Sequence, residues 1–103
     1  MKKLQPTTQY KKDYKKYRNN PKKVEALKEV LEMLINDQPI PEAYRPHMLH
    51  GEYKGCMECH IEGDFLLIWI DEETETIELV RLGSHSELFK SRMTIMTNDI
   101  VII

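Results

Sequence analysis

Residues 53–82 read YKGCMECHIEGDFLLIWIDEETETIELVRL, and three strand-length runs within them set the architecture. The runs at 53–61, 65–70 and 76–82 are rich in β-branched and aromatic residues, which favour strands. The connections EGD at 62–64 and DEETE at 71–75 are short enough for hairpins. We therefore predict an antiparallel meander of three strands.

Two helices are predicted before these strands. Residues 8–19 place Tyr10, Tyr14 and Tyr17 on one helical face, with lysines on the others, so these aromatics suit a core better than a base-stacking surface. Asn20 and Pro21 then fit the N-cap and first position of a second helix, whose apolar residues repeat at helical spacing up to residue 35. Helices followed by strands predict an α+β fold, an N-terminal helical hairpin packed on a small antiparallel sheet.

The two ends of the chain are less regular. Residues 2–6 are predicted as a short strand that Pro6 would confine to a sheet edge or terminate. Residues 90–103 finish in IVII, for which we expect an extra strand or an oligomer contact, with cloning-derived sequence as an open alternative. At 103 residues the chain fits one compact domain, placed at 1–89, with 90–103 as a C-terminal extension of unknown role.

Composition limits the compartment. There is no apolar run long enough to cross a bilayer, and the start MKKLQP lacks the apolar region of a signal peptide. We therefore expect a cytoplasmic protein that does not contact membranes. In that compartment Cys56 and Cys59 are expected to be reduced thiols.

Charge is unevenly distributed along the chain. The formal net charge of −2 argues against a generic nucleic-acid binder. Residues 1–30, however, hold ten Lys and Arg against three acids, while residues 31–80 hold two against twelve. The basic half could meet phosphates by counterion release, or its charges could simply solvate a helical face.

Ionisable residues suited to acid–base chemistry concentrate between positions 47 and 85. On a strand, Glu58 and His60 share a face, as do Leu79 and Arg81. Imidazole can act as base or acid near neutrality, and a guanidinium binds two phosphate oxygens at once. These residues could therefore cleave RNA without a metal, through attack by a 2′-hydroxyl, or they could have a structural role. The set consists of His47, His50, Glu58, His60, Asp64, Arg81 and His85.

Two metal-containing alternatives use the segment CMECH at 56–60. It matches the c-type haem attachment pattern, but that chemistry requires export, and the motif falls in a predicted strand. His47, His50, Cys56, Cys59 and His60 could instead form a structural zinc site. On a strand Cys56 and Cys59 would face opposite sides, which disfavours joint coordination.

Three blocks resemble one known family. YRPHMLHGEYKG at 44–55, ECHIEGDFLLI at 58–68 and RLGSHSELF at 81–89 resemble the YafQ-type mRNA interferase toxins of the RelE/ParE superfamily in order and spacing, and KKDYKK at 11–16 extends the likeness to about residues 4–89. Pro46, Met48 and Gly63 depart from that family's usual Asp, Pro and Pro. Family members normally end near Phe89.

The resemblance implies a RelE-like fold and a ribosome-dependent endoribonuclease that cleaves mRNA in the A site and is inhibited by an antitoxin protein. It implies no cofactor and no metal. Arg81 would hold phosphate and Phe89 would pack against a base or shape the pocket. By position, acid–base chemistry and its support would fall to His47, His60, Asp64, His85 and Glu58.

Other functions remain open at this level. A gyrase-directed ParE-like toxin or a non-catalytic binding module of the same fold is the main alternative, although ParE-like chains generally lack the histidine and acid set. A small zinc-binding structural protein is the third hypothesis. DNA-damage induction would indicate gyrase, loss of translation without it would indicate mRNA cleavage, and metal analysis would test zinc.

Overall fold

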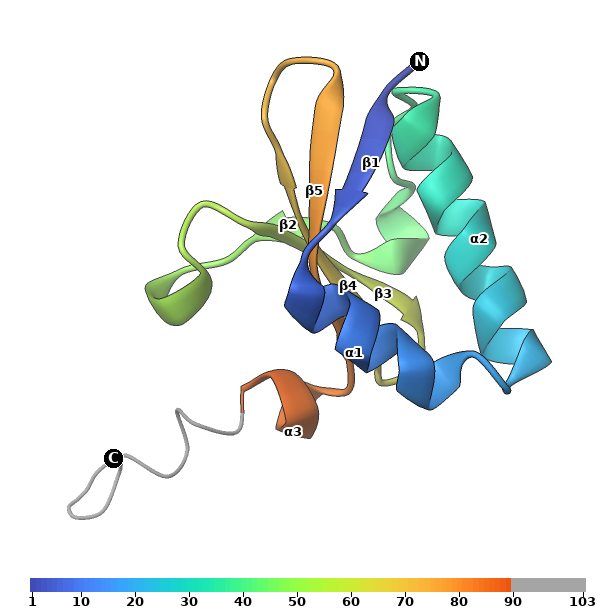
Figure 1. The fold of residues 1–103 in the computed structure, drawn as a ribbon. Helices are drawn as coiled ribbons and strands as arrows, with labels where there is room; N and C mark the ends of the chain where they lie inside the picture. The colour runs from blue at the N-terminus through green and yellow to red at the C-terminus, as the bar shows by residue number, and fades with distance from the viewer. Residues whose placement is uncertain (90–103) are drawn as a thin grey trace, which may run out of the picture.

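The structure, a computed structural model, describes residues 1–89 and contains one five-stranded mixed sheet with helices packed against it (Figure 1). The strand order is β1-β5-β4-β3-β2. The elements are β1 (Lys3–Pro6), α1 (Thr8–Tyr17), α2 (Pro21–Ile35), η1 (Glu42–Tyr44), β2 (His47–Met48), η2 (Gly51–Tyr53), β3 (Met57–Glu62), β4 (Phe65–Asp71), β5 (Thr76–Gly83) and α3 (His85–Leu88).

Both long helices begin at side-chain caps. The Thr7 hydroxyl accepts a hydrogen bond from the Tyr10 amide at the start of α1. The Asn20 side chain accepts one from the Lys23 amide at the start of α2, and Pro21 occupies the first position, where its missing amide donor costs nothing. The predicted helical hairpin and its Asn20–Pro21 junction are confirmed.

The meander β3-β4-β5 is antiparallel, as predicted, but its first strand is shorter. Residues 53–56 were expected to belong to it. Tyr53 instead closes the 3₁₀ helix η2, and Gly55 adopts a φ of +90°, a left-handed value that interrupts an extended chain. β3 therefore begins at Met57, and the two-residue strand β2, which the sequence did not reveal, pairs with it.

The first strand is where the predicted antiparallel sheet needs correcting. Residues 3–6 form a strand that ends at Pro6, as expected, but β1 runs parallel to β5 at the sheet edge, with Lys3 opposite Thr76 and Leu4 opposite Ile77. A parallel pair needs a long connection, which here contains both long helices and the strands β2, β3 and β4. The sheet is therefore mixed.

Hydrophobic residues pack on both faces of the sheet. The larger core lies under the helices, where Leu27, Val30 and Leu34 of α2 meet β-sheet residues such as Leu67 and Trp69. A smaller cluster on the other face contains Cys56, Leu66, Ile68 and Leu88, with Leu49, Tyr53, Ile70, Val80 and Phe89 packed against it. The predicted core role of the α1 tyrosines is confirmed, because Tyr10 is buried and Tyr14 and Tyr17 pack on the larger core.

Within residues 1–89, none of the helices has the length and apolar character needed to cross a bilayer. The strand or oligomer contact expected for residues 90–103 lies outside the described residues.

Candidate active site

Histidines from three different elements line up over the face of the sheet that carries the smaller hydrophobic cluster. β2 supplies His47, β3 supplies His60, and α3 begins with His85. The ring centroids of His47 and His60 are 6.3 Å apart, and those of His60 and His85 are 5.5 Å apart. Glu58 stands opposite His47 in the β2-β3 register and, two residues from His60, shares its face as predicted.

His47 and Glu58 form a carboxylate–imidazole pair at one end of the histidine row. The His47 Nδ1 lies 2.8 Å from the Arg45 carbonyl oxygen, which can only accept, so Nδ1 carries a hydrogen. The Nε2 atom lies 3.1 Å from Glu58 Oε1, and a favourable contact there requires a proton on the imidazole or on the carboxyl. Glu58 is 2% exposed, and its Oε2 is the one buried side-chain N or O atom in residues 1–89 without a hydrogen-bond partner.

Asp64 and His85 form a second carboxylate–imidazole pair, at the open end of the site. Asp64 lies in the turn between β3 and β4, and its Oδ1 accepts hydrogen bonds from the His85 amide at 3.0 Å and from the His85 Nδ1 at 2.7 Å. These bonds, the backbone one first, lower the pKa of Asp64 below its ordinary value. Since Nδ1 is bonded to Asp64, Nε2 is the ring atom that remains for a substrate.

The turn that carries Asp64 differs from the usual sequence of the YafQ-type toxins at position 63. Gly63, where the family usually has proline, adopts a φ of +50°. Proline cannot reach a positive φ, so the turn presents Asp64 through a backbone conformation that the usual residue would forbid.

Arg81 lies on the site's face of the sheet, but not for the reason the sequence suggested. Leu79 and Arg81 were expected to share a face. The β4-β5 register shifts at Val80, so that Ile68 pairs with Arg81 while Trp69 pairs with Leu79. Such a bulge turns the following side chain over. Leu79 therefore joins the core under the helices, and Arg81 stands opposite Ile68 on the other face.

The guanidinium of Arg81 is held by two residues that sequence reasoning missed. Its Nε and Nη2 donate to the buried carboxylate of Asp13 in α1 at 2.8 and 3.2 Å, and its Nη1 donates to the Tyr53 hydroxyl at 3.1 Å. Asp13 also accepts from the Leu82 amide at 2.9 Å. Three of the five guanidinium N–H groups are thus used, which leaves two for a phosphate.

Hydrogen bonds from two tyrosine hydroxyls hold α3, and therefore His85, in position. The Tyr53 hydroxyl donates to the Leu88 carbonyl at 2.9 Å, and the Tyr17 hydroxyl donates to the Glu87 carboxylate. Glu87 also closes a capping box with Ser84 at the start of the helix. A four-residue helix would not persist alone, so these side chains hold the His85 ring in place.

An open cavity of about 590 Å³ lies over this site. Its lining includes the two ends of the histidine row and the ring of Phe89, which packs edge-on against Tyr53 with centroids 5.5 Å apart. The complete lining is His47, Leu49, His50, Gly51, Glu58, His85 and Phe89. All seven predicted site residues thus lie in one region, although Arg81 points toward Asp13 and Tyr53 rather than into the cavity.

The cysteine-based metal sites are wrong. Cys56 is buried in the cluster on the site's face, whereas Cys59 is buried in the core under the helices. Two thiols on opposite faces of a sheet cannot ligate one zinc ion, nor can both attach covalently to one haem. Among residues 1–89, the His, Cys, Asp and Glu side chains close enough to share an ion are Glu58, His60 and His85.

The sequence profile of the family described as "Bacterial toxin of type II toxin-antitoxin system, YafQ" matches residues 2–90. The chain belongs to the YafQ toxin family. It is 35% identical over 82 residues to the mRNA interferase toxin YafQ of Escherichia coli, covering 79% of this chain and 88% of that protein. It is 44% identical over 57 residues to a YafQ toxin of Haemophilus influenzae, covering 52% of this chain and 56% of that relative, little more than half its length.

Solved YafQ-type structures share the fold. A copper-bound mutant toxin from Helicobacter pylori superposes with a TM-score of 0.78 at 36% identity, covering 86% of this chain and 100% of that one. YafQ in the E. coli DinJ–YafQ complex gives a TM-score of 0.76 at 30% identity, covering 86% and 99%. The predicted α+β, RelE-like architecture is confirmed, and so is the resemblance drawn from the three sequence blocks.

Proposed function

We propose that this YafQ-family chain is an endoribonuclease of a type II toxin–antitoxin system that cleaves mRNA in the ribosomal A site by acid–base chemistry, without a metal or organic cofactor. The observation that carries the proposal is a row of three imidazoles beside one open cavity, with a carboxylate paired to the histidine at each end of the row. The E. coli relative is named an mRNA interferase, which supports the substrate class. The proposed catalytic domain is 1–89, acting in the cytoplasm, where ribosomes are found.

The two carboxylate–imidazole pairs suit the two proton transfers of RNA cleavage. In the first, the Glu58–His47 pair takes the proton of the 2′-hydroxyl while that oxygen attacks the adjacent phosphorus. Glu58 fits because its Oε2 has no partner among the described residues and is shielded from water. In the second, the His85 Nε2 gives its proton to the departing 5′-oxygen, which leaves a 2′,3′-cyclic phosphate and a 5′-hydroxyl.

The remaining site residues would bind the scissile nucleotides. Arg81 has two N–H donors left after its bonds to Asp13 and Tyr53, enough for two oxygens of a phosphate that gains negative charge in the transition state. His60 lies between the other two histidines and can donate to the same phosphate. The Phe89 ring at the cavity wall can pack against a base.

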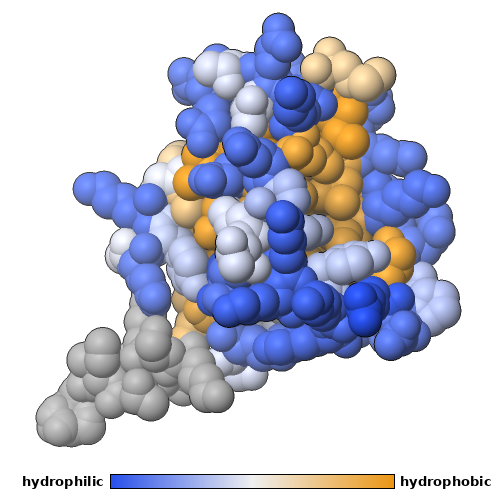
Figure 2. Space-filling view, in the orientation of Figure 1, coloured by the Kyte–Doolittle hydropathy of each residue, from blue (hydrophilic) through white to orange (hydrophobic). Residues whose placement is uncertain are grey.

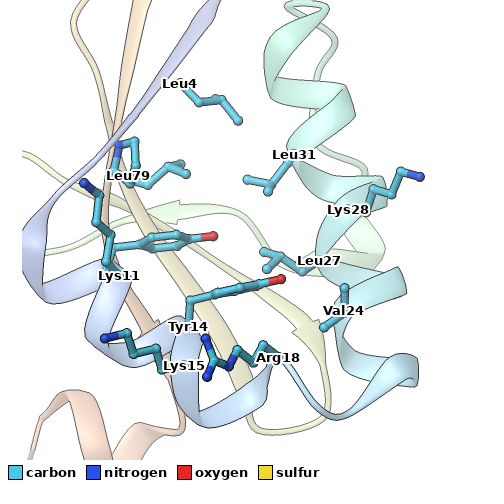
Figure 3. Close-up of a pocket in the computed structure, with 12 residues that line it drawn as sticks. Leu4, Lys11, Tyr14, Lys15, Arg18, Val24, Leu27, Lys28, Leu31 and Leu79 are labelled. Atoms are coloured by element: carbon cyan, nitrogen blue, oxygen red, sulfur yellow. The ribbon is translucent and has the colours of Figure 1, made fainter.

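A groove under the helices supports an antitoxin as the protein partner, as in the E. coli DinJ–YafQ complex. The groove is a cavity of about 630 Å³ between α1, α2 and the β1-β5 edge. Figure 2 shows hydrophobic surface there between hydrophilic borders, and in Figure 3 leucines point into the space while basic side chains stand at its margin. Apolar residues Leu4, Tyr10, Tyr14, Val24, Leu27, Leu31 and Leu79 line it, with Lys11, Lys15, Arg18 and Lys28.

This pattern fits one occupant, an amphipathic segment of the antitoxin with an apolar stripe and acidic flanks. The groove lies under the helices, whereas the histidine cavity lies on the other face of the sheet. A segment bound in the groove would therefore anchor the antitoxin by contacts separate from the catalytic groups. It would also cover lysines of α1 that could otherwise meet RNA phosphates.

Primer extension on a defined mRNA in a purified translation system tests the enzyme directly. The protein and its His85→Ala variant are compared with and without ribosomes. We expect cuts within codons that require both ribosomes and His85. Growth arrest on expression without the antitoxin should likewise be relieved by the substitution.

Absence of cuts under every condition would instead support a non-catalytic or gyrase-directed toxin of the same fold. Induction of the DNA-damage response on expression would then identify gyrase as the target.

A further inference from the structure

We propose that Tyr53 is a positioning residue that links Arg81 to helix α3, so that the guanidinium and the His85 imidazole keep one mutual geometry. The catalytic consequence rests on the proposed function, since it concerns the groups assigned there to the phosphate and to the departing oxygen. The link itself does not, because it depends only on the contacts of the Tyr53 hydroxyl.

The Tyr53 hydroxyl bridges two elements that carry different parts of the site. It accepts a hydrogen bond from Arg81 Nη1 at 3.1 Å and donates its own hydrogen to the Leu88 carbonyl oxygen at 2.9 Å. The direction of both bonds is fixed, because a guanidinium can only donate and a carbonyl can only accept. A chain of hydrogen bonds therefore runs from β5 through Tyr53 to the end of α3, and each bond in such a chain strengthens the other.

The surroundings of Tyr53 keep this bridge intact. Burial raises the pKa of the phenol above its ordinary value, although the charge of Arg81 opposes the change. The hydroxyl therefore retains the hydrogen that the Leu88 carbonyl accepts. Leu88 is 2% exposed, so its carbonyl would have little access to water if this donor were removed.

The loop that carries Tyr53 is closed by its own hydrogen bonds, which limits the directions that the side chain can take. The Lys54 amide donates to the Gly51 carbonyl at 3.1 Å. The Cys56 amide donates to the Tyr53 carbonyl at 2.9 Å. Gly51 and Gly55 adopt left-handed φ values of +70° and +90°, which glycine reaches without strain. The loop thus holds the tyrosine between β5 and α3.

Tyr53 lies behind the wall of the histidine cavity. Among residues 1–89, the lining of that cavity includes His85 and Phe89 but not Tyr53. An effect of the hydroxyl on cleavage must therefore pass through the residues that it contacts. Loss of the hydroxyl would free the Arg81 guanidinium and the Leu88 carbonyl together, so the phosphate ligand and the proton donor would lose their mutual alignment. A displacement of about 1 Å at a catalytic group can cost roughly 100-fold in rate.

Hydrogen exchange measured by NMR on the full chain tests the link without reference to activity. The signals followed are the Arg81 Nε–H and the Leu88 amide, which donates to the Ser84 carbonyl within α3. Tyr53→Phe removes the hydroxyl and keeps the aromatic ring, and it should speed exchange at both positions by about threefold to tenfold, the effect of one lost hydrogen bond.

Two matched variants make the same chemical change elsewhere. Tyr17→Phe removes the other tyrosine contact to α3, so it should speed exchange of the Leu88 amide and leave the Arg81 Nε–H as in the wild type. Tyr44→Phe alters a tyrosine that packs on the larger core under the helices, and it should change neither signal. Only Tyr53→Phe is expected to affect both ends of the bridge.

The cleavage assay in the purified translation system then tests the catalytic consequence. It is run where the circular dichroism spectra of wild type, Tyr53→Phe and Tyr44→Phe match, so that unfolding does not contribute. Tyr53→Phe should lower kcat about 10- to 100-fold and change KM by less than about threefold, because Arg81 and His85 act most strongly in the transition state. Tyr44→Phe should keep both constants.

Unchanged exchange at either Arg81 or Leu88 in Tyr53→Phe would overturn the link. Exchange that is faster by the same factor throughout the fold would overturn it too, because the hydroxyl would then contribute to global stability alone. Faster exchange at both positions with an unchanged kcat would refute the catalytic role of the link. A wild type that never cuts, together with the expected exchange rates, would refute the proposed function and leave the link between Arg81 and α3 standing.

Discussion

Replacing Asp13 with asparagine tests how much the fold depends on the contact between α1 and Arg81. Asp13 is 1% exposed and accepts four hydrogen bonds, two from Arg81, one from the Leu82 amide and a longer one, at 3.4 Å, from the Gln9 side chain. An asparagine oxygen placed at Oδ2 keeps the bonds at 2.8 and 2.9 Å. Its amide nitrogen then faces Arg81 Nη2, so the bond at 3.2 Å is lost together with the negative charge.

The expected cost follows from those contacts. A hydrogen bond between charged groups contributes about 1.5–3 kcal/mol, and loss of one partner of a buried ion pair costs more because it leaves an uncompensated charge. The Arg81 side chain is 19% exposed, so water recovers part of that loss. We expect Asp13→Asn to lower the free energy of unfolding by about 2 kcal/mol, and the melting temperature by roughly 10 °C for a domain of this size.

Urea denaturation followed by circular dichroism measures the change. Asp37→Asn is the matched control, since it makes the same chemical change at an exposed position, and it should alter the free energy of unfolding by no more than about 0.5 kcal/mol. Asp13→Asn should also reduce mRNA cleavage, because Arg81 loses the partner that aims its guanidinium. An Asp13→Asn variant as stable as Asp37→Asn would refute the assignment of a structural ion pair to these residues.

Three further outcomes are expected. The pKa of Asp64 is lowered in the folded protein, so its bonds to His85 stabilise the fold fully above the ordinary aspartate pKa. That stabilisation is lost as the pH falls through the lowered pKa. The difference in unfolding free energy between wild type and Asp64→Asn should therefore shrink in acid. Lys15→Glu at the groove margin should weaken antitoxin binding in a salt-dependent way, measured by calorimetry, whereas Lys22→Glu, exposed on α2 outside the groove lining, should not. Burial raises the pKa of Cys59 to about 12 and raises that of Cys56, so iodoacetamide at pH 8 should label both thiols only after unfolding; rapid labelling of the folded chain would contradict their burial.

Local signals in the sequence were enough for the helices and the meander. Asn20 and Pro21 mark a helix start through chemistry confined to a few neighbouring residues, and the structure places the cap there. The alternation that put Glu58 and His60 on one face also held, because β3 is regular between them. The prediction of function depended on the three-block resemblance, since the spacing of the ionisable residues alone was compatible with a nuclease and with a structural role.

Features that depend on distant residues could not be read in this way. The bulge at Val80 reverses the expected direction of Arg81, and nothing local in LVRL marks it. The parallel pairing of β1 with β5 joins residues more than 70 positions apart. Asp13 did leave a signal, because an acid on the same helical face as Tyr10 and Tyr17 indicates a buried partner, but the sequence did not identify that partner as Arg81.

The pairing of the first strand with the last bears on when this protein becomes active during its own synthesis. β1 cannot pair until β5 (Thr76–Gly83) has been synthesised, and Asp13 cannot form its ion pair until Arg81 has been synthesised. Such non-local contacts form late and slow folding. At about 5–20 residues per second, a ribosome needs roughly 5–20 s to make this chain, and His85 is reached only near the end. The histidine cavity is thus complete only after most of the chain has been synthesised, and the antitoxin has that interval in which to bind.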